Sequence, residues 1–190
     1  LKHTATADDN PIILTLQTGE TDIAANDVIG AINFQAPDEG TGTDAILVAA
    51  GTEAVSEGDF SSSNNATRLG FKTGASEAAA EKMTLSSAGN LGIGTTAPSQ
   101  MLHLQSTGDA IILLEADTDN SNENDNPRIM FSQDGGGATA RIGYTDGLNT
   151  FEVFNEYGDD LLFGTNNTER MRIKNAGNVE IHADLLMDHD

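Results

Sequence analysis

The hydrophobic residues of this chain lie in short islands, and several islands alternate between apolar and polar side chains. The alternation is clearest at residues 128–132, 141–145 and 170–174. A period of two places apolar side chains on one face of a strand and polar side chains on the other. Glycine-rich breakers such as residues 134–137 separate the islands and are typical of hairpin turns. The pattern predicts an all-β fold built from many short strands.

One strand-rich segment occurs twice, at residues 81–93 and again at 169–181. Further matches precede it in the same order in both halves: 11–14 with 110–113, 32–34 with 129–131, and 69–71 with 161–163. Ordered matches with changing spacing are typical of a duplicated unit with variable loops. We therefore predict two tandem β-repeats, residues 1–100 and 101–190, arranged as a β-sandwich or a β-prism and intertwined in a trimeric fibre.

Both copies of the repeated segment contain Ala-Gly-Asn between two short apolar strands. A tight reversal at this place needs residues that tolerate left-handed backbone geometry, and glycine and asparagine do so at low cost. We predict that Gly89 and Asn90 in the first copy, and Gly177 and Asn178 in the second, are structural turn residues without a chemical role.

The charge balance restricts the partners of the chain. Its 30 acidic and 9 basic residues give a formal net charge of −21, which repels phosphate backbones and anionic membrane surfaces. We expect no nucleic-acid binding and no membrane insertion, since no apolar run approaches the roughly 18–20 residues that span a bilayer. The chain has no cysteine, which excludes disulfides and thiolate chemistry.

Residues 83–104 of the first copy resemble a segment that recurs in phage tail fibres and tail spikes, where it commonly lies upstream of an endosialidase-type intramolecular chaperone domain. The resemblance implies a homotrimeric, β-rich shaft or knob on a virion or cell surface, often engaged in host attachment. The second copy departs from this pattern, because Glu180 and His182 stand where the first copy has the glycines of Gly-Ile-Gly. The resemblance marks an architecture and names no ligand.

One segment, residues 117–126, is dense in oxygen ligands. Its first residues fit the opening of a calcium loop, with donors at alternate positions in Asp117, Asp119, Ser121 and Glu123. The remainder departs from an EF-hand, because Asn122 stands where glycine is needed and Arg128 where a bidentate glutamate is needed. Two readings stay open: a calcium site, and a solvated connecting loop, which the polar composition alone explains. Apart from calcium we expect no cofactor.

The sequence shows no catalytic constellation. Nucleophile elbows, phosphate-binding loops and dinucleotide fingerprints are missing from it, and close pairs among 30 acids arise by accident. His103 falls on an alternating strand, where we expect a surface or subunit-contact imidazole. On the strand near Phe151, Phe151 and Val153 face opposite to Phe154, so one set suits a core or subunit contact and the other a neighbouring subunit or a sugar ring.

These observations favour a non-catalytic structural and adhesive component of a virion fibre or spike, located on a virion surface or outside the cell. Its expected partners are other copies of itself, neighbouring virion or fibre proteins, and a cell-surface glycan or receptor. One alternative is a subunit of an extracellular filament or a capsid decoration protein. An alternative of another class is a carbohydrate-processing enzyme that uses acids such as Asp117, Asp119 and Glu123.

Overall fold

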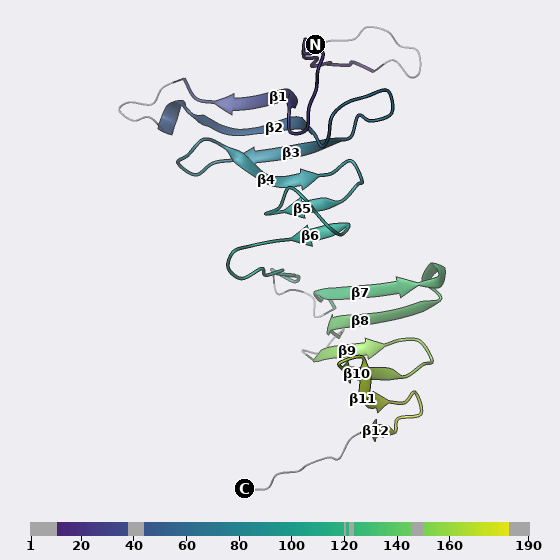
Figure 1. The fold of residues 1–190 in the computed structure, drawn as a ribbon. Coiled ribbons are helices and arrows are strands. Elements are labelled where there is room, and N and C mark those ends of the chain that lie inside the picture. Colours follow the sequence, from purple (N-terminus) through teal and green to yellow (C-terminus); the bar gives the residue numbers. More distant parts are fainter. Residues whose placement is uncertain (1–10, 38–43, 120, 122–123, 146–149, 183–190) are drawn as a thin grey trace. The chain divides into compact units, whose positions relative to one another are not determined.

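The computed structural model describes residues 11–37, 44–119, 121, 124–145 and 150–182. These residues form strands β1 to β12, two short 3-10 turns and no α-helix (Figure 1), which confirms the all-β prediction. They divide into two compact units, with the division between Ile111 and Ile112. No helix in the described part of the chain is long and apolar enough to cross a membrane.

The first unit contains a single six-stranded sheet in which the strands follow one another in sequence order (Figure 1). Strands β1 to β5 pair antiparallel, whereas β6 runs parallel to β5. The strands are β1 (Val28–Gln35), β2 (Val48–Ser56), β3 (Thr67–Thr73), β4 (Ala80–Leu85), β5 (Leu91–Ile93) and β6 (Leu102–Leu104).

The register of this sheet aligns its apolar side chains in two rows that run across all six strands, because residues directly opposite one another share a face. The first row is Gly30, Ala54, Leu69, Leu85, Leu91 and Leu102, and the second row is Ile32, Thr52, Phe71, Met83, Ile93 and Leu104. We call these the two apolar rows. Most of their large side chains are exposed, for example Phe71, Leu85 and Ile93.

The opposite face of the same sheet is polar, and its central row includes Glu53, Thr84 and His103. His103 therefore lies opposite in direction to Leu102 and Leu104, as predicted. Among the described residues the only buried hydrophobic side chain is Val55, which is 2% exposed. A sheet with one open apolar face and almost no buried core lacks the packing that stabilises a soluble monomer.

The second unit contains two three-stranded antiparallel sheets, β7-β8-β9 and β10-β11-β12. A short 3-10 turn at Asp134–Gly136 joins β7 to β8, where the sequence predicts a hairpin. The strands are β7 (Arg128–Gln133), β8 (Ala138–Tyr144), β9 (Phe151–Asn155), β10 (Leu161–Thr165), β11 (Thr168–Ile173) and β12 (Val179–Ile181). Strands β7, β8 and β11 confirm the three segments with the clearest alternation.

The sheet β10-β11-β12 has the same register as β3-β4-β5 of the first unit. Leu161 faces Ile173 and Phe163 faces Met171, as Leu69 faces Leu85 and Phe71 faces Met83. In both sheets an irregularity in pairing follows the phenylalanine of the first strand. Most apolar side chains of this sheet thus lie on one face, in the same arrangement as the corresponding part of the two apolar rows, whereas Leu162 lies on the face of Arg172.

The second unit differs from the first in the partner of its second strand. In the first unit β2 pairs with β3, whereas in the second unit β8 pairs with β9, and β10, which matches β3 in sequence, begins another sheet. Strand β9 therefore pairs with β8 in the second unit, as β3 pairs with β2 in the first. This additional strand explains why one continuous sheet in the first unit corresponds to two sheets in the second.

Residues 75–82 have the composition of a helix but are too short to form one alone, so the sequence predicts a loop, with at most one helical turn. The structure has a loop without a helical turn at residues 75–79, and Ala80 begins β4. The sequence also predicts turns at residues 38–42 and 146–147, which lie outside the described residues. The predicted repeat boundaries, 1–100 and 101–190, stay predictions, as does the sandwich or prism arrangement.

Candidate functional site

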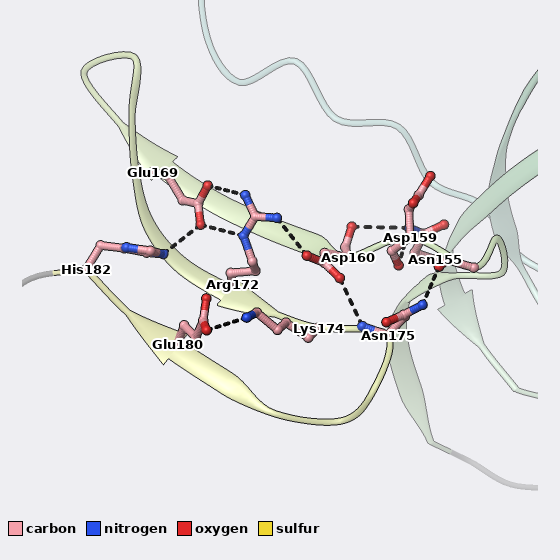
Figure 2. A network of polar contacts seen from close by, with 10 residues as sticks. Asn155, Asp159, Asp160, Glu169, Arg172, Lys174, Asn175, Glu180 and His182 are labelled. Atoms are coloured by element: carbon pink, nitrogen blue, oxygen red, sulfur yellow. Dashed lines mark hydrogen bonds and ion pairs between the residues drawn. The ribbon is translucent and has the colours of Figure 1, made fainter.

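The polar face of the sheet β10-β11-β12 carries a network of neighbouring charged side chains, shown in Figure 2. At its centre Arg172 on β11 binds Glu169 with two prongs, since Nε and Nη2 donate to the two carboxylate oxygens at 2.7 and 2.6 Å. The remaining Nη1 of Arg172 donates to Oδ2 of Asp160 at 2.6 Å. One guanidinium thus joins the start of β10 to β11 through the fork geometry that favours arginine over lysine.

The network extends to both sides of this centre (Figure 2). Nε2 of His182 lies 2.8 Å from Oε1 of Glu169, just beyond the end of β12. Lys174 forms an ion pair with Glu180, across the turn between β11 and β12. All these side chains are partly or largely exposed, so the network organises a surface and contributes little to stability on its own.

The central arginine shifts the titration of its neighbours. Hydrogen bonds from Arg172 hold the pKa of Glu169 below its ordinary value of about 4.5. The hydrogen bond from Arg172, assisted by the backbone N–H of Asn175, holds the pKa of Asp160 below its ordinary value of about 3.8. The two carboxylates in turn raise the pKa of Arg172. The carboxyl groups of Glu169 and Asp160 are therefore ionised at neutral pH.

Beside this network the turn from β9 to β10 presents an aromatic side chain, Tyr157, which is 53% exposed. Asn155 pins the turn from within, because its Oδ1 accepts from the backbone N–H of Tyr157 at 3.1 Å and its Nδ2 donates to the Asp159 carbonyl at 3.1 Å. Asn175 pins it from the neighbouring turn, since its Nδ2 donates to the Gly158 carbonyl at 2.6 Å. Side-chain hydrogen bonds of Asn155 and Asn175 thus hold the backbone of the turn that carries the exposed Tyr157.

This arrangement suits recognition better than reaction. An exposed aromatic ring on a turn next to amide, carboxylate and guanidinium groups offers one stacking surface and several hydrogen-bonding groups of both kinds. The carboxylates are held ionised by Arg172, so they accept hydrogen bonds and do not supply the proton that a general acid must donate.

The first unit also carries ion pairs on the polar face of its sheet. Arg68 on β3 pairs with Glu81 on β4 at 3.3 Å, and the Thr84 hydroxyl donates to the same carboxylate. Lys72 pairs with Glu53 at 2.6 Å. Both units therefore place ion pairs on the face opposite their apolar side chains, which indicates that this face is the one turned to water.

The candidate calcium loop lies only partly within the described residues, because Glu123 falls outside them. The other three candidates lie together: Oδ1 of Asp117 accepts from the backbone N–H of Ser121 at 3.0 Å, and Oδ1 of Asp119 accepts from the Ser121 hydroxyl at 2.9 Å. Within the described residues no group of three or more acidic, histidine or cysteine side chains could hold a metal ion. Calcium binding stays a prediction.

The Ala-Gly-Asn turns have the same hydrogen bonds in both copies. Gly89 and Gly177 have φ values of 82° and 87°, the left-handed geometry expected of glycine. Their N–H groups donate to the carbonyls of Ser86 and Lys174, which close the two turns. Asn90 and Asn178 do not adopt positive φ. Instead the Asn90 and Asn178 carbonyls accept from the first residue of each turn, and Asn90 also donates through Nδ2 to the Pro98 carbonyl.

The aromatic residues of β9 divide between two faces as the alternation predicts. Phe151 and Val153 share a face with Tyr144 and Ile142 of β8, whereas Phe154 lies on the other face. The Arg141 guanidinium carbon lies 4.7 Å from the centre of the Phe154 ring, so Phe154 belongs to the charged face.

An open hollow of about 700 Å³ adjoins the apolar face of β7-β8-β9. Its lining includes Phe131, Ala140 and Leu161. Phe131 and Ala140 share the apolar face of this sheet.

The sequence did not reveal the network of Figure 2 as a site, because its members lie scattered over residues 155–182 and come together only through the register of β10, β11 and β12. The one usable signal was the strict alternation at 170–174. It places Arg172 on a polar face, but it does not name the partners of Arg172.

Comparisons with known proteins concern the fold. No protein-family model matches the chain, and no curated protein matches it in sequence. Among solved structures, the carboxy-terminal domain of the bacteriophage T5 L-shaped tail fibre is similar over 98% of this chain and 91% of that chain, with 13% sequence identity and a TM-score of 0.50. The same tail-fibre domain with its intramolecular chaperone domain matches over 98% of this chain and 63% of that chain, with 13% identity and a TM-score of 0.48. The fold of this chain is thus of the phage tail fibre type, as the sequence resemblance implies.

Proposed function

We propose that this chain is a non-catalytic structural segment of a virion fibre, and that its copies assemble into a homotrimer through their apolar faces. The observation that carries the proposal is the pair of open apolar rows in the first unit, where Phe71, Leu85 and Ile93 are exposed together. Contiguous apolar surface of this kind marks an interface. The fold similarity to a tail fibre domain supports the fibre context, and the resemblance of residues 83–104 to tail fibre segments implies the trimeric state.

Association of copies would bury the apolar rows that a single sheet leaves exposed. Buried apolar surface stabilises by roughly 25 cal/mol per Å², and in one copy Val55 is the only described hydrophobic side chain that is buried. Three sheets with apolar faces turned inward would bury the rows and leave the ion pairs of the opposite faces in water. The charge of −21 per chain then coats the outside, and added salt should favour assembly by screening the repulsion.

Mass measurement under native conditions tests the proposal. We expect a trimer for the natural chain and a loss of trimer for Phe71→Gln, which places an amide in an apolar row. Lys72→Gln is the matched control, because it introduces the same residue at the adjacent position on the polar face. A stable monomer would contradict self-association, and a dimer would contradict the trimeric state.

We further propose that the polar face attaches the fibre to a glycan or receptor on the host surface. The specific support is the rigid turn that presents Tyr157 beside the network of Arg172, where stacking and hydrogen bonds are available together. Repetition in an oligomer multiplies weak contacts through effective concentration. The non-catalytic part of the proposal predicts retained binding without turnover on polysaccharides, and depolymerisation by the purified chain would contradict it.

A further inference from the structure

Two apolar segments lie outside every sheet, one upstream of the first strand of each unit. Residues 11–16 (Pro-Ile-Ile-Leu-Thr-Leu) precede β1, and residues 110–114 (Ala-Ile-Ile-Leu-Leu) precede β7. We call them the first arm and the second arm. Both are rich in isoleucine and leucine and carry no charge, in a chain whose net charge is −21. Nothing in their composition opposes burial against an apolar surface.

The backbone of both arms is without partners among the described residues. No hydrogen bond joins residues 11–16 or 110–114 to any strand described in the structure, although both arms have the composition of a strand. In contrast, β1, which begins at Val28, forms an antiparallel ladder with β2.

In both arms, consecutive apolar residues are exposed, so apolar side chains are not confined to one side of the segment. In the first arm Ile13 is 75% exposed and its neighbours Ile12 and Leu14 are exposed as well, and in the second arm Leu113 is 79% exposed. An extended segment that is apolar on both sides is typical of chain covered on both faces. A surface connection would instead carry polar residues on at least one side.

The end of the first arm already rests on the apolar face of its own sheet. Gly30 occupies the outermost position of the first apolar row and has no side chain to fill it. Leu16 fills this position, because its Cβ lies 3.2 Å from the place that a Cβ on Gly30 would take. The first arm is therefore anchored at the edge of the apolar rows, with residues 11–14 leading away from the anchor.

We propose that residues 11–14 of one copy extend from the Leu16 anchor onto the apolar rows of a second copy, so that the first arm becomes part of the interface between copies. The second arm has a similar sequence and a similar exposure. This inference rests on the proposed self-association. A second copy is the occupant that fits, because Leu16 joins the arm to the same apolar face through which copies are proposed to associate.

A photo-crosslinking experiment on the assembled protein tests the arm. Leu14 is replaced with benzoylphenylalanine, which reacts with C–H groups in reach, and the products are separated by mass and mapped by peptide sequencing. We expect a product of twice the chain mass, with the crosslink at residues of the apolar rows in β1 to β6. The same probe at Asn33, on the polar face of β1, should give no product between copies.

Each outcome has a distinct meaning. If the assembled protein gives only crosslinks within one chain, or none, the arm does not contact a second copy and the inference fails while the proposed assembly stands. If native mass shows a monomer, the proposed assembly itself fails. As a second readout, Ile13→Gln and Leu14→Gln together should raise the concentration at which the oligomer dissociates by about tenfold or more, because the change removes apolar area from the interface. An unchanged dissociation concentration would overturn the inference.

Discussion

Arg172 and Glu169 lie three residues apart on one strand and form a two-pronged ion pair, with N···O distances of 2.7 and 2.6 Å. Residues two apart point to the same face of a regular strand, so a spacing of three would normally send these side chains to opposite faces. The pairing between β10 and β11 is irregular after Phe163, opposite the stretch between Met171 and Glu169. The irregularity turns Glu169 toward Arg172 and lets both reach the polar face.

This ion pair makes the stability of the second unit depend on pH in a defined direction. Because the pKa values of Glu169 and Asp160 are lowered in the folded chain, their contribution to stability is fully present above their ordinary values of about 4.5 and 3.8. The contribution is lost as the pH falls through those values toward the lower folded values. Arg172→Gln removes the largest cause of both shifts.

Thermal melting at fixed protein concentration, from about pH 6 to about pH 3, measures the effect. The natural chain should lose more melting temperature over this range than the Arg172→Gln variant. The difference should be small, because the side chains of Arg172 and Asp160 are 30% and 22% exposed and solvent screens the pair. Parallel curves for the two proteins would show that the ion pairs do not contribute.

The Ala-Gly-Asn turn predicts a second measurable effect. Gly89→Ala should lower the free energy of unfolding by about 1–2 kcal/mol, because φ is 82° and an L-residue is strained there. A Cβ at Gly89 meets no atom within 4 Å, so the cost comes from the backbone alone.

Gly108→Ala is the control for this substitution, since a Cβ there also meets no atom within 4 Å and its φ is not positive. Denaturant titration of both variants at one protein concentration gives the comparison. Equal stability of the two variants would mean that the left-handed geometry of the turn is not required. The equivalent change Gly177→Ala, at φ 87°, should behave like Gly89→Ala.

The calcium hypothesis for Asp117, Asp119, Ser121 and Glu123 makes a third prediction. Added calcium should raise the melting temperature of the natural chain, because a ligand that binds only the folded state stabilises it. Asp117→Asn should weaken the rise, since it removes a charged ligand. Magnesium at the same ionic strength controls for general screening of the net charge. A melting temperature that does not change with calcium would remove the metal and leave the connecting loop.

How far the sequence predicts this fold follows from which interactions are local. Alternation at 170–174 and the match between 69–71 and 161–163 were sufficient to identify β11, β3 and β10, because side-chain direction in a strand depends on position alone. Strand β9 has no counterpart in the first copy, so no internal match indicated that β8 would pair with it.

The sequence alone predicts neither the network around Arg172 nor the open apolar face, for two different physical reasons. The contacts of Arg172 with Asp160 and Glu169 depend on strand register, which the sequence pattern fixes only to within a shift of two residues. The exposure of Phe71 depends on what covers it, and no pattern within one chain shows whether the cover comes from another part of that chain or from another copy.

The ring of Tyr157 is exposed on the turn between β9 and β10. If the turn between β9 and β10 stacks on a sugar, Tyr157→Ala should weaken binding to an array of bacterial surface polysaccharides by about two- to tenfold per site, since an aromatic contact is worth roughly 0.5–1.5 kcal/mol. Tyr157→Phe should keep most of the binding, because it retains the ring and removes only the hydroxyl. Neither change should alter the melting temperature, because hydrogen bonds of Asn155 and Asn175 to the backbone hold the turn and the Tyr157 side chain does not. Full binding by the alanine variant would exclude this turn as the attachment site and leave the assembly of the fibre untouched.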